Sequence, residues 1–400
     1  MKSEWTYRPL GELVSFASGG TPSKKRDDYW GGTIPWISAK TLKTENIDTS
    51  DLFITEEGLK AGSKIAPKGS ILLLTRGSGL FNGIPIARVE KDVAFNQDIK
   101  CLDSYGEVEN EFIFYWLLSQ KDYLMAKVGV TGIGAGKFDL DFLQKLMIPI
   151  PSERERKSIV GFASSISEKI RCNAKVNDNL EQQAVALFKS WFVDFSLFGG
   201  TVPENWEDTT LENITTLITR GIAPKYSDNS DQTVVNQKCI RNHTIDLSLA
   251  RTHTPKAINE KWLKFGDLLI NSTGDGTLGR VAQVWFTPKA LTVDSHVTIV
   301  RPAREELIFY IGLWGILHEK EIESLHTGST GQTELPRDRV KKLKLLLPDN
   351  ISLSRFNSII APMASTIISN QEENQKLASL RDTLLPKLMS GEIDVSSIQL

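Results

Sequence analysis

Several features are scarce in this 400-residue chain, and each scarcity excludes a class of protein. The three cysteines (Cys101, Cys172 and Cys239) lie far apart and the five histidines do not cluster, so neither a zinc framework nor a secreted disulfide framework is predicted. No run approaches the roughly 18 apolar residues of a membrane span, and no signal-peptide pattern opens the chain, so we expect a cytoplasmic protein. With a formal net charge of −2, bulk basicity gives no reason to bind nucleic acid.

What the chain does contain is a long internal repeat. Sliding the sequence against itself by about 197 residues pairs the same landmarks in the same order, which indicates a tandem duplication of whole domains rather than a solenoid. The paired segments are APKGSILLLTRGSG (66–79) with LKFGDLLINSTGDG (263–276), FIFYWLL (112–118) with LIFYIGL (307–313), VGVTGIGAGKFDLDFLQKLMIPIP (128–151) with LHTGSTGQTELPRDRVKKLKLLLP (325–348), and LEQQAVALFKSWF (180–192) with LASLRDTLLPKLM (377–389).

Each copy divides into a strand-rich part and a helical part. The first 150 residues or so of each copy hold short β-branched runs broken by Gly, Pro and Asn-Gly, which predicts strands and hairpins with a helical stretch behind them. The expected fold class is therefore α+β, with two similar mixed α/β domains. The predicted boundaries are 1–151 for the first domain, 152–198 for a central long helix, 199–349 for the second domain and 350–400 for a distal long helix.

The two helical parts carry a heptad pattern. Five matched apolar or amide positions in each copy predict that the two helices bury one face against each other as an antiparallel coiled coil, each a rod of roughly 50–60 Å. Pro362 is expected to kink or shorten the second helix. The predicted seam residues are Ile159, Ile166, Asn173, Leu180 and Leu187 in the first helix, and Phe356, Met363, Asn370, Leu377 and Leu384 in the second.

Asn173 and Asn370 occupy the same seam position in the two copies. A buried amide at such a position costs stability but fixes the register of the helix pair. The alternative, that both side chains face solvent, stays open at the level of the sequence.

Several segments, taken together and in order, resemble one family. The chain is similar, over essentially its whole length, to the specificity subunit of type I restriction–modification enzymes. The segments that carry the resemblance are GELVSFASGGTP (11–22), YWGGTIPWISAKTL (29–42), TGIGAGKFDLDFLQKLMIPIPS (131–152), LFKSWFVDF (187–195), TGSTGQTELPRDRVKKLKLLLP (327–348) and LRDTLLPKLMSGEI (380–393).

The resemblance implies a non-catalytic subunit that recognises double-stranded DNA through two target-recognition domains. It also implies that the chain docks two modification (methyltransferase) subunits and assembles with restriction (motor-nuclease) subunits. S-adenosylmethionine and ATP with magnesium would then belong to those partners, and this chain would hold no cofactor. A scaffold whose two domains bind proteins without reading DNA remains the alternative.

Sequence readout needs side chains that form paired hydrogen bonds with base edges, and cationic or hydroxyl groups for phosphates. The candidates lie in polar segments beside Gly-rich turns, although a solvated loop is an open alternative for 24–26, and a core role is an open alternative for Trp36. The second domain departs from the family pattern, because TRGSG (75–79) becomes STGDG (272–276). The candidate DNA-binding residues are Lys24, Lys25, Arg26, Trp36, Ser38, Lys40, Arg76 and Ser78 in the first domain, and Arg220, Lys225, Tyr226, Asn236, Gln237, Lys238, Arg241 and Asn242 in the second.

None of the apparent enzyme motifs contains all the residues that its chemistry requires. The stretch GVTGIGAGKF resembles a phosphate-binding loop, but Thr131 stands where that motif needs glycine and Phe138 replaces the Ser or Thr that would hold magnesium. We therefore predict no catalytic residues and no metal site. Trp5 and Trp206, at equivalent places in the repeat, are expected to be core anchors.

Overall fold

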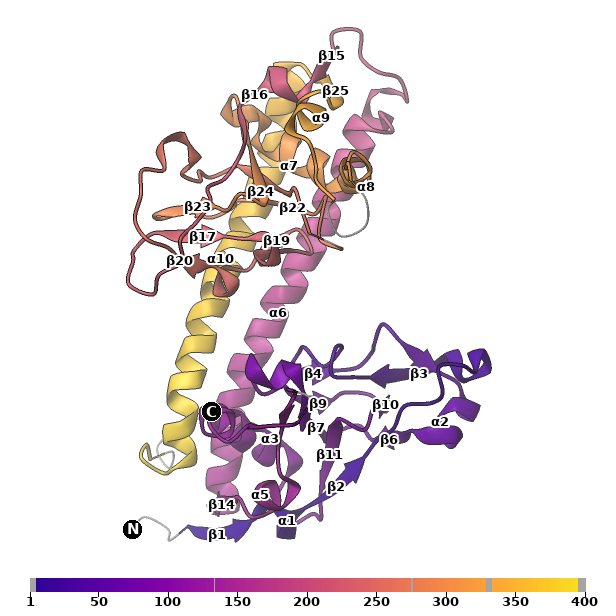
Figure 1. The fold of residues 1–400 in the computed structure, drawn as a ribbon, viewed down its shortest axis with the longest axis vertical. Helices are drawn as coiled ribbons and strands as arrows, with labels where there is room; N and C mark the ends of the chain where they lie inside the picture. The colour runs from indigo at the N-terminus through magenta and orange to yellow at the C-terminus, as the bar shows by residue number, and fades with distance from the viewer. Residues whose placement is uncertain (1–4, 133, 275, 329–332, 395–400) are drawn as a thin grey trace. The chain divides into compact units, whose positions relative to one another are not determined.

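The computed structural model describes residues 5–132, 134–274, 276–328 and 333–394 (Figure 1). The chain divides into two compact units, one formed by residues 1–171 with 374–400 and the other by residues 172–373. Each unit combines the strand-rich part of one copy with one half of each of two long helices. The predicted mixed α/β fold, built from two similar domains and long helices, is confirmed.

The first unit is built on a five-stranded sheet in the order β2-β11-β7-β9-β4, backed by helix α3. A second sheet, β5-β3-β10-β6, continues from it and carries helix α2 at its edge. The elements are β2 (Val14–Ser18), β3 (Trp30–Ile37), β4 (Asn46–Ile47), β5 (Phe53–Ile54), α2 (Glu56–Gly62), β6 (Lys64–Ala66), β7 (Ile71–Leu74), β9 (Ile86–Val89), β10 (Val93–Phe95), β11 (Ile99–Ser104) and α3 (Asn110–Ser119). Strand runs such as ILLL are buried throughout because both faces of the sheet are covered.

The second unit repeats this plan with shorter sheets. Strands β16, β24, β21 and β22 form one sheet in that order, and β20, β17 and β23 form the other. The elements are β16 (Thr215–Arg220), β17 (Thr233–Val235), β20 (Arg251–Thr252), β21 (Leu268–Asn271), β22 (Val281–Gln283), β23 (Leu291–Val293), β24 (Val297–Pro302) and α7 (Ile308–Leu317). In both units a two-stranded antiparallel sheet joins the start of the domain to its end: β1 (Thr6–Pro9) with β14 (Met147–Ile150), and β15 (Glu207–Thr210) with β25 (Lys344–Leu347).

Backbone pairing shows which residues of the two domains correspond. The amide of Phe138 donates to the carbonyl of Thr75, and the amide of Leu335 donates in the same way to Ser272. Gly19 and Gly221 are both pressed against a backbone carbonyl, where a Cβ would come within about 2 Å of the oxygen. The duplication expected from the sequence is therefore present in the fold.

Two helices of 40 residues follow the domains, α6 (Glu153–Phe192) and α10 (Asn350–Met389). Ser152 and Glu155 form a capping box at the start of α6, with the Ser152 amide donating to Oε2 of Glu155 at 2.9 Å. The shortening expected at Pro362 is wrong, because α10 continues through it. Pro362 is exposed, so the carbonyl that loses its partner lies on the solvent side.

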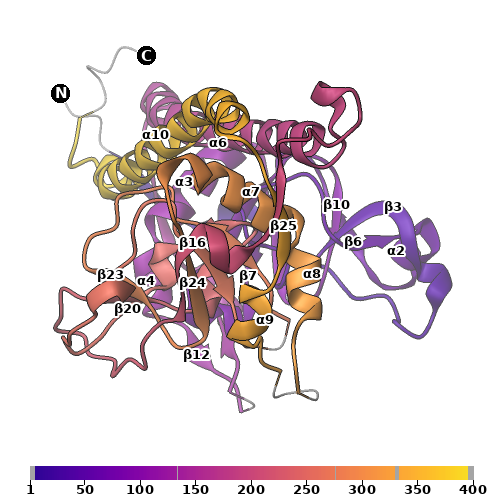
Figure 2. The same ribbon diagram turned by 90° about the horizontal axis from the view of Figure 1, so that it is seen from above.

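In each unit α6 and α10 lie side by side and antiparallel (Figures 1 and 2). In the second unit Nδ2 of Asn177 donates to the carbonyl of Ile367 at 3.4 Å. In the first, Nδ2 of Asn374 donates to the carbonyl of Ile170 at 3.3 Å. These two bonds occupy equivalent positions of the repeat.

Burial along the helices follows the predicted seam at first and then moves by one residue. Ile159 is completely buried, but four heptads later Leu187 is only partly buried and its neighbour Phe188 is 1% exposed. In α10, Phe356 is completely buried, Leu384 is partly buried and Leu385 is 1% exposed. A straight α-helix returns to the same face after about 29 residues rather than 28, which accounts for the shift. Of the remaining seam residues, Ile166 and Asn173 are buried and Leu180, Met363, Asn370 and Leu377 are half-buried.

Candidate DNA-reading sites

In the first domain three chain segments meet where central strands end. Residues 38–40 follow β3, residues 76–78 follow β7, and the third segment is the hairpin of β12 (Gly129–Val130) and β13 (Gly136–Lys137). A Cβ placed on Gly77 would lie 3.9 Å from the Cβ of Ala39, so the first two segments are neighbours. Strand β13 pairs with β8 (Arg76–Gly77), which brings the hairpin to the same place. Four predicted residues, Ser38, Lys40, Arg76 and Ser78, therefore gather at one site.

The centre of this site is a pair of cations on adjacent strands. Arg76 and Lys137 stand directly opposite each other in the antiparallel pairing of β8 with β13. Both side chains are exposed. Neither has a hydrogen bond or an ion pair within the part of the chain that the structure describes. Opposed like charges are unfavourable in a sheet, so this arrangement favours an electron-rich ligand.

Glycines hold these two strands close. Gly77 has φ +135°, a conformation that side-chain-bearing residues avoid. Gly136 is buried, and a Cβ on it would meet Cβ of Leu80 at 2.9 Å and the Gly77 carbonyl oxygen at 3.1 Å. The backbone thus fixes the positions from which the side chains of Arg76 and Lys137 project.

The second domain builds the same site from different residues. Residues 236–238 follow β17, and Nδ2 of Asn236 donates to the Leu249 carbonyl while its Oδ1 caps the amide of Lys238. The turn after β21 approaches this loop, since Oγ1 of Thr273 donates to Oε1 of Gln237 at 3.2 Å. Thr273 also bridges to Glu334 in an isolated antiparallel pair. Thr273 and Glu334 therefore stand where the first domain has Arg76 and Lys137.

The charge of Glu334 at this second site is paired within the domain. Arg220, a predicted contact, forms an ion pair with Oε1 of Glu334 at 2.8 Å and donates a hydrogen bond to the Leu335 carbonyl at 3.0 Å. Oγ1 of Thr273 also lies 2.6 Å from Nδ1 of His296. Gln237, Thr273 and His296 thus form one hydrogen-bonded group, and Arg220 with Glu334 forms an ion pair beside it, in contrast to the unpaired cations of the first domain.

The other first-domain candidates lie elsewhere. Lys24, Lys25 and Arg26 are exposed in the turn before β3, and Arg26 pairs with Asp28 at 2.6 Å. Trp36 is 3% exposed, and its Nε1 donates to the Gly20 carbonyl at 3.0 Å. Its ring packs edge-on against Trp30. Trp36 is a core residue, and we withdraw it as a DNA contact because a buried ring offers no face to a base.

Of the remaining second-domain candidates, Lys238 belongs to the 236–238 segment and the others lie outside the three segments. Lys225, Lys238 and Arg241 are exposed. Tyr226 lies beneath the guanidinium of Arg251, 3.7 Å from ring centroid to Cζ. Asn242 has φ +50° in the turn between the short strands β18 (Ile240–Arg241) and β19 (Thr244–Ile245), so its position is dictated by the hairpin.

The Gly-Lys turn does not form a phosphate-binding loop. Lys137 lies on strand β13, whereas that motif places its lysine at the start of a helix. Within the described residues no group of three or more His, Cys, Asp or Glu could hold a metal ion. No helix among those residues is long and apolar enough to cross a bilayer.

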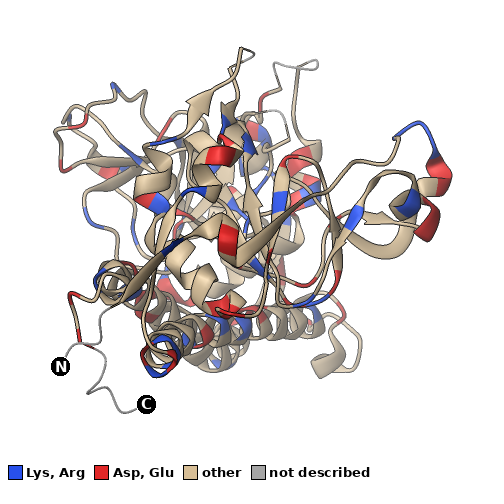
Figure 3. Ribbon diagram, turned by 90° about the horizontal axis from the view of Figure 1, so that it is seen from below, with Lys and Arg blue, Asp and Glu red and all other residues tan. Residues whose placement is uncertain are grey.

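Charges of both signs are interspersed along the ribbon (Figure 3), in keeping with the net charge of −2. Residue types alone did not point to Lys137, Thr273, His296 and Glu334 as parts of these sites. The repeat alignment of TRGSG with STGDG, combined with that of GAGKF with GQTEL, contains the signal that would have found most of them.

Comparisons with known proteins agree with this architecture. Residues 2–182 match the family model described as the type I restriction modification DNA specificity domain. The specificity subunit of the type I restriction enzyme MjaIX from Methanocaldococcus jannaschii is 27% identical over 427 residues, covering 99% of this chain and 95% of that one. The EcoR124I/EcoR124II specificity subunit from Escherichia coli is 31% identical over 161 residues, 40% of each chain.

Among solved structures, the S subunit of a type I restriction–modification system from M. genitalium has the same fold. It aligns with a TM-score of 0.55 and 17% identity over 96% of both chains. Residues 2–182 thus match a DNA specificity domain of type I restriction–modification systems, and the chain is similar over nearly its whole length to a specificity subunit of a type I restriction enzyme.

Proposed function

We propose that this subunit recognises an asymmetric bipartite DNA site, each domain reading one half. The observation that carries the proposal is that the same three-segment site occurs in both domains with different side chains. Two copies of one scaffold with diverged polar groups suit two different base sequences, since base identity is read by the pattern of donors and acceptors.

We further propose that α6 and α10 set the gap between the two halves. Each helix has 40 residues and is therefore about 60 Å long. B-DNA repeats every 34–36 Å, so a gap of one to two helical turns lies within the reach of such an element. The hydrogen bonds that Asn177 and Asn374 donate to backbone carbonyls of the facing helix support a fixed register.

The partners we propose are two copies of a modification (methyltransferase) subunit, with restriction (motor-nuclease) subunits added in the full complex. A duplicated chain offers two similar docking surfaces, which suits two copies of one partner. The near-neutral charge is compatible with DNA binding if partners supply much of the phosphate neutralisation. S-adenosylmethionine and ATP with magnesium would be held by those partners, and this subunit would contribute recognition.

The test is binding of the full chain, with its modification partner, to a library of duplexes carrying two short random blocks at varied separations. We expect selection of one sequence in each block, different sequences in the two blocks, and one preferred gap. Affinity should fall with rising salt concentration. Retention of all duplexes alike, or no retention, would support the alternative of a protein scaffold that does not read DNA.

A further inference from the structure

We propose that Arg76 and Lys137 together read the acceptor edge of a guanine in the first half-site, resting on the proposed function above. The pair of exposed cations projects from strands that pair in register, at the meeting point of the three segments that form the reading site. Guanine presents two acceptors, N7 and O6, in the major groove, and arginine or lysine is the side chain that matches them.

The first step concerns the charge of the ligand. Arg76 and Lys137 face each other across β8 and β13 with no acidic partner among the described residues. Asp98 is the acidic residue next to this turn, and its backbone carbonyl accepts hydrogen bonds from the amides of Thr75 and Arg76. Its carboxylate, however, accepts a bond from Nδ2 of Asn96. The cations are thus left for an external group that supplies acceptors.

The second step distinguishes a base from a phosphate. Phosphates are the same in both half-sites, so a residue that holds a phosphate should keep its charge between the two domains. At the equivalent positions the second domain has Thr273 and Glu334, which replaces two positive charges by one hydroxyl and one carboxylate. Because Glu334 is paired with Arg220, the second domain presents no free cation at these two positions to hold a phosphate. A change of this kind is expected where the two domains face different base edges.

The third step concerns preorganisation. Gly77 and Gly136 fix the two strands at close approach, and Phe138 locks β13 onto the turn through its bond to Thr75. The second domain keeps that lock through Leu335 and Ser272 while changing the side chains beside it. The scaffold therefore tolerates either set of residues, which makes these positions specificity-determining rather than structural.

The test exchanges the first-domain pair for the residues of the second domain, as the double variant Arg76→Thr with Lys137→Glu. The full chain with its modification partner is assayed on its selected bipartite duplex and on duplexes with each base pair of the first half-site changed in turn. For the wild-type protein, we expect one G·C pair whose replacement weakens binding about 10- to 100-fold. In the variant this discrimination should disappear, while discrimination in the second half-site is unchanged.

A matched control is Lys68→Glu, which reverses an exposed lysine in the same domain outside the three segments. Circular dichroism and thermal unfolding verify that each variant folds. Uniform weakening on every duplex, with a smaller dependence on salt, would identify a phosphate contact and overturn the inference. Unaltered discrimination by the variant would overturn it as well. Failure of the wild-type protein to select a bipartite site would instead refute the proposed function.

Discussion

At the level of single residues, a tryptophan at the start of each domain donates a hydrogen bond to a carboxylate at the start of a long helix. The carboxylate is a glutamate in the first copy and an aspartate in the second. Nε1 of Trp5 donates to Glu155 in the first turn of α6 at 3.3 Å, and Nε1 of Trp206 donates to Asp349, which precedes α10, at 2.8 Å. Trp206 is 6% exposed, so its indole N–H needs this partner. The expectation that both tryptophans are core anchors is confirmed for Trp206, whereas Trp5 is partly buried and packs against the edge of the first core.

Asp349 should make the second unit sensitive to acid. Burial would raise the pKa of its carboxyl, but hydrogen bonds from Ser352, Trp206 and backbone amides lower that pKa to about 2. A carboxyl with a lowered folded pKa stabilises the fold above its unfolded pKa of about 4, and this contribution is lost as pH falls from about 4 towards 2. We expect Asp349→Asn to flatten the dependence of the melting temperature on pH in that range.

Two further variants complete this measurement. Asp349→Ala also removes the helix cap and should cost about 1 kcal/mol more at neutral pH, because asparagine can still cap α10 whereas alanine cannot. Asp194→Asn, which alters an exposed carboxylate, serves as the control and should leave the acid dependence intact. An Asp349→Asn protein with an unchanged pH profile would contradict the proposed stabilisation.

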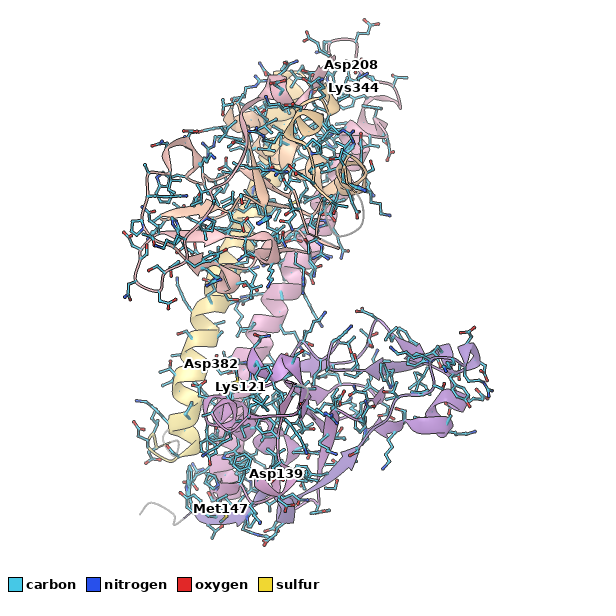
Figure 4. All side chains as sticks on the ribbon, in the orientation of Figure 1. Lys121, Asp139, Met147, Asp208, Lys344 and Asp382 are labelled. Carbon is cyan, nitrogen blue, oxygen red and sulfur yellow. The ribbon has the colours of Figure 1, made fainter. Side chains whose placement is uncertain are left out.

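At the level of elements, the halves of the long helices are bound to their domains in two different ways. In the first unit Arg381 of α10, whose side chain is 9% exposed, forms two hydrogen bonds with Glu45, at 2.6 and 3.1 Å. Lys121 and Asp382, both labelled in Figure 4, flank this pair. In the second unit Phe188, Phe192 and Phe356 pack with Tyr310 and Trp206 instead.

The ion pair of the first unit should therefore be sensitive to loss of one partner. Glu45→Gln removes the carboxylate that bonds Arg381 twice and leaves its mostly buried guanidinium only the exposed Asp382. We expect a loss of about 2–3 kcal/mol in unfolding free energy, reduced from the fully buried case by the partial exposure of Glu45 and by the remaining pair. Replacing both residues by apolar ones, Glu45→Leu with Arg381→Met, should recover much of it. Denaturant titration with hydrogen exchange of α10 measures both effects.

The surface pair of Glu153 with Lys157, 2.5 Å apart and well exposed on both sides, supplies the comparison. Glu153→Gln should leave stability almost unchanged, because water screens an exposed ion pair. If Glu45→Gln proved as mild as this control, the buried pair would not be what holds α10 to the first domain.

The helix seam shows what sequence periodicity can and cannot predict. The heptads place Ile159 and Phe356 correctly, because one buried position every seven residues needs only local regularity. At the far ends burial passes to Phe188 and Leu385, since the pattern does not tell whether the helix supercoils or stays straight. Sequence periodicity does not predict the ion pair of Arg381 with Glu45, because the two residues are 336 positions apart and no local pattern links them.

At the level of the whole molecule, the duplication was the part of the fold most readily predicted, and the reading sites the least. Arg76 is predicted from its Gly-rich turn and Lys40 from the polar segment that includes Ser38, but the prediction for Trp36 is wrong because aromatic residues serve cores and bases equally well. Thr273 and Glu334 became candidates only when pairing placed them opposite Arg76 and Lys137 in the scaffold. Strand register, which the sequence does not specify, decides which side chains share a site.

The proposed spacing role predicts the effect of lengthening the helices. Inserting one heptad at the middle of α6 and one at the middle of α10 adds about 10 Å to each, which corresponds to about three base pairs of B-DNA. Library selection with this variant should return the original two half-sites with the gap widened by about three base pairs. A heptad in only one helix should abolish pairing and binding. Recovery of the original gap by the doubly extended protein would count decisively against the spacer role.

Independent readout predicts the outcome of a domain exchange. Each domain has its own sheets, its own core and its own three-segment site. The hydrogen bond of Thr273 with Gln237 and the backbone bridge of Thr273 with Glu334 are formed entirely from second-domain residues. Replacing residues 1–151 by the corresponding domain of another family member should therefore change the bases selected in the first half-site and leave the second half-site as it was. Methylome sequencing of cells expressing the hybrid with its modification partner reads both halves at once. Because the helices are unchanged, the gap should also stay the same, and a hybrid that altered both half-sites would show that the two domains do not read independently.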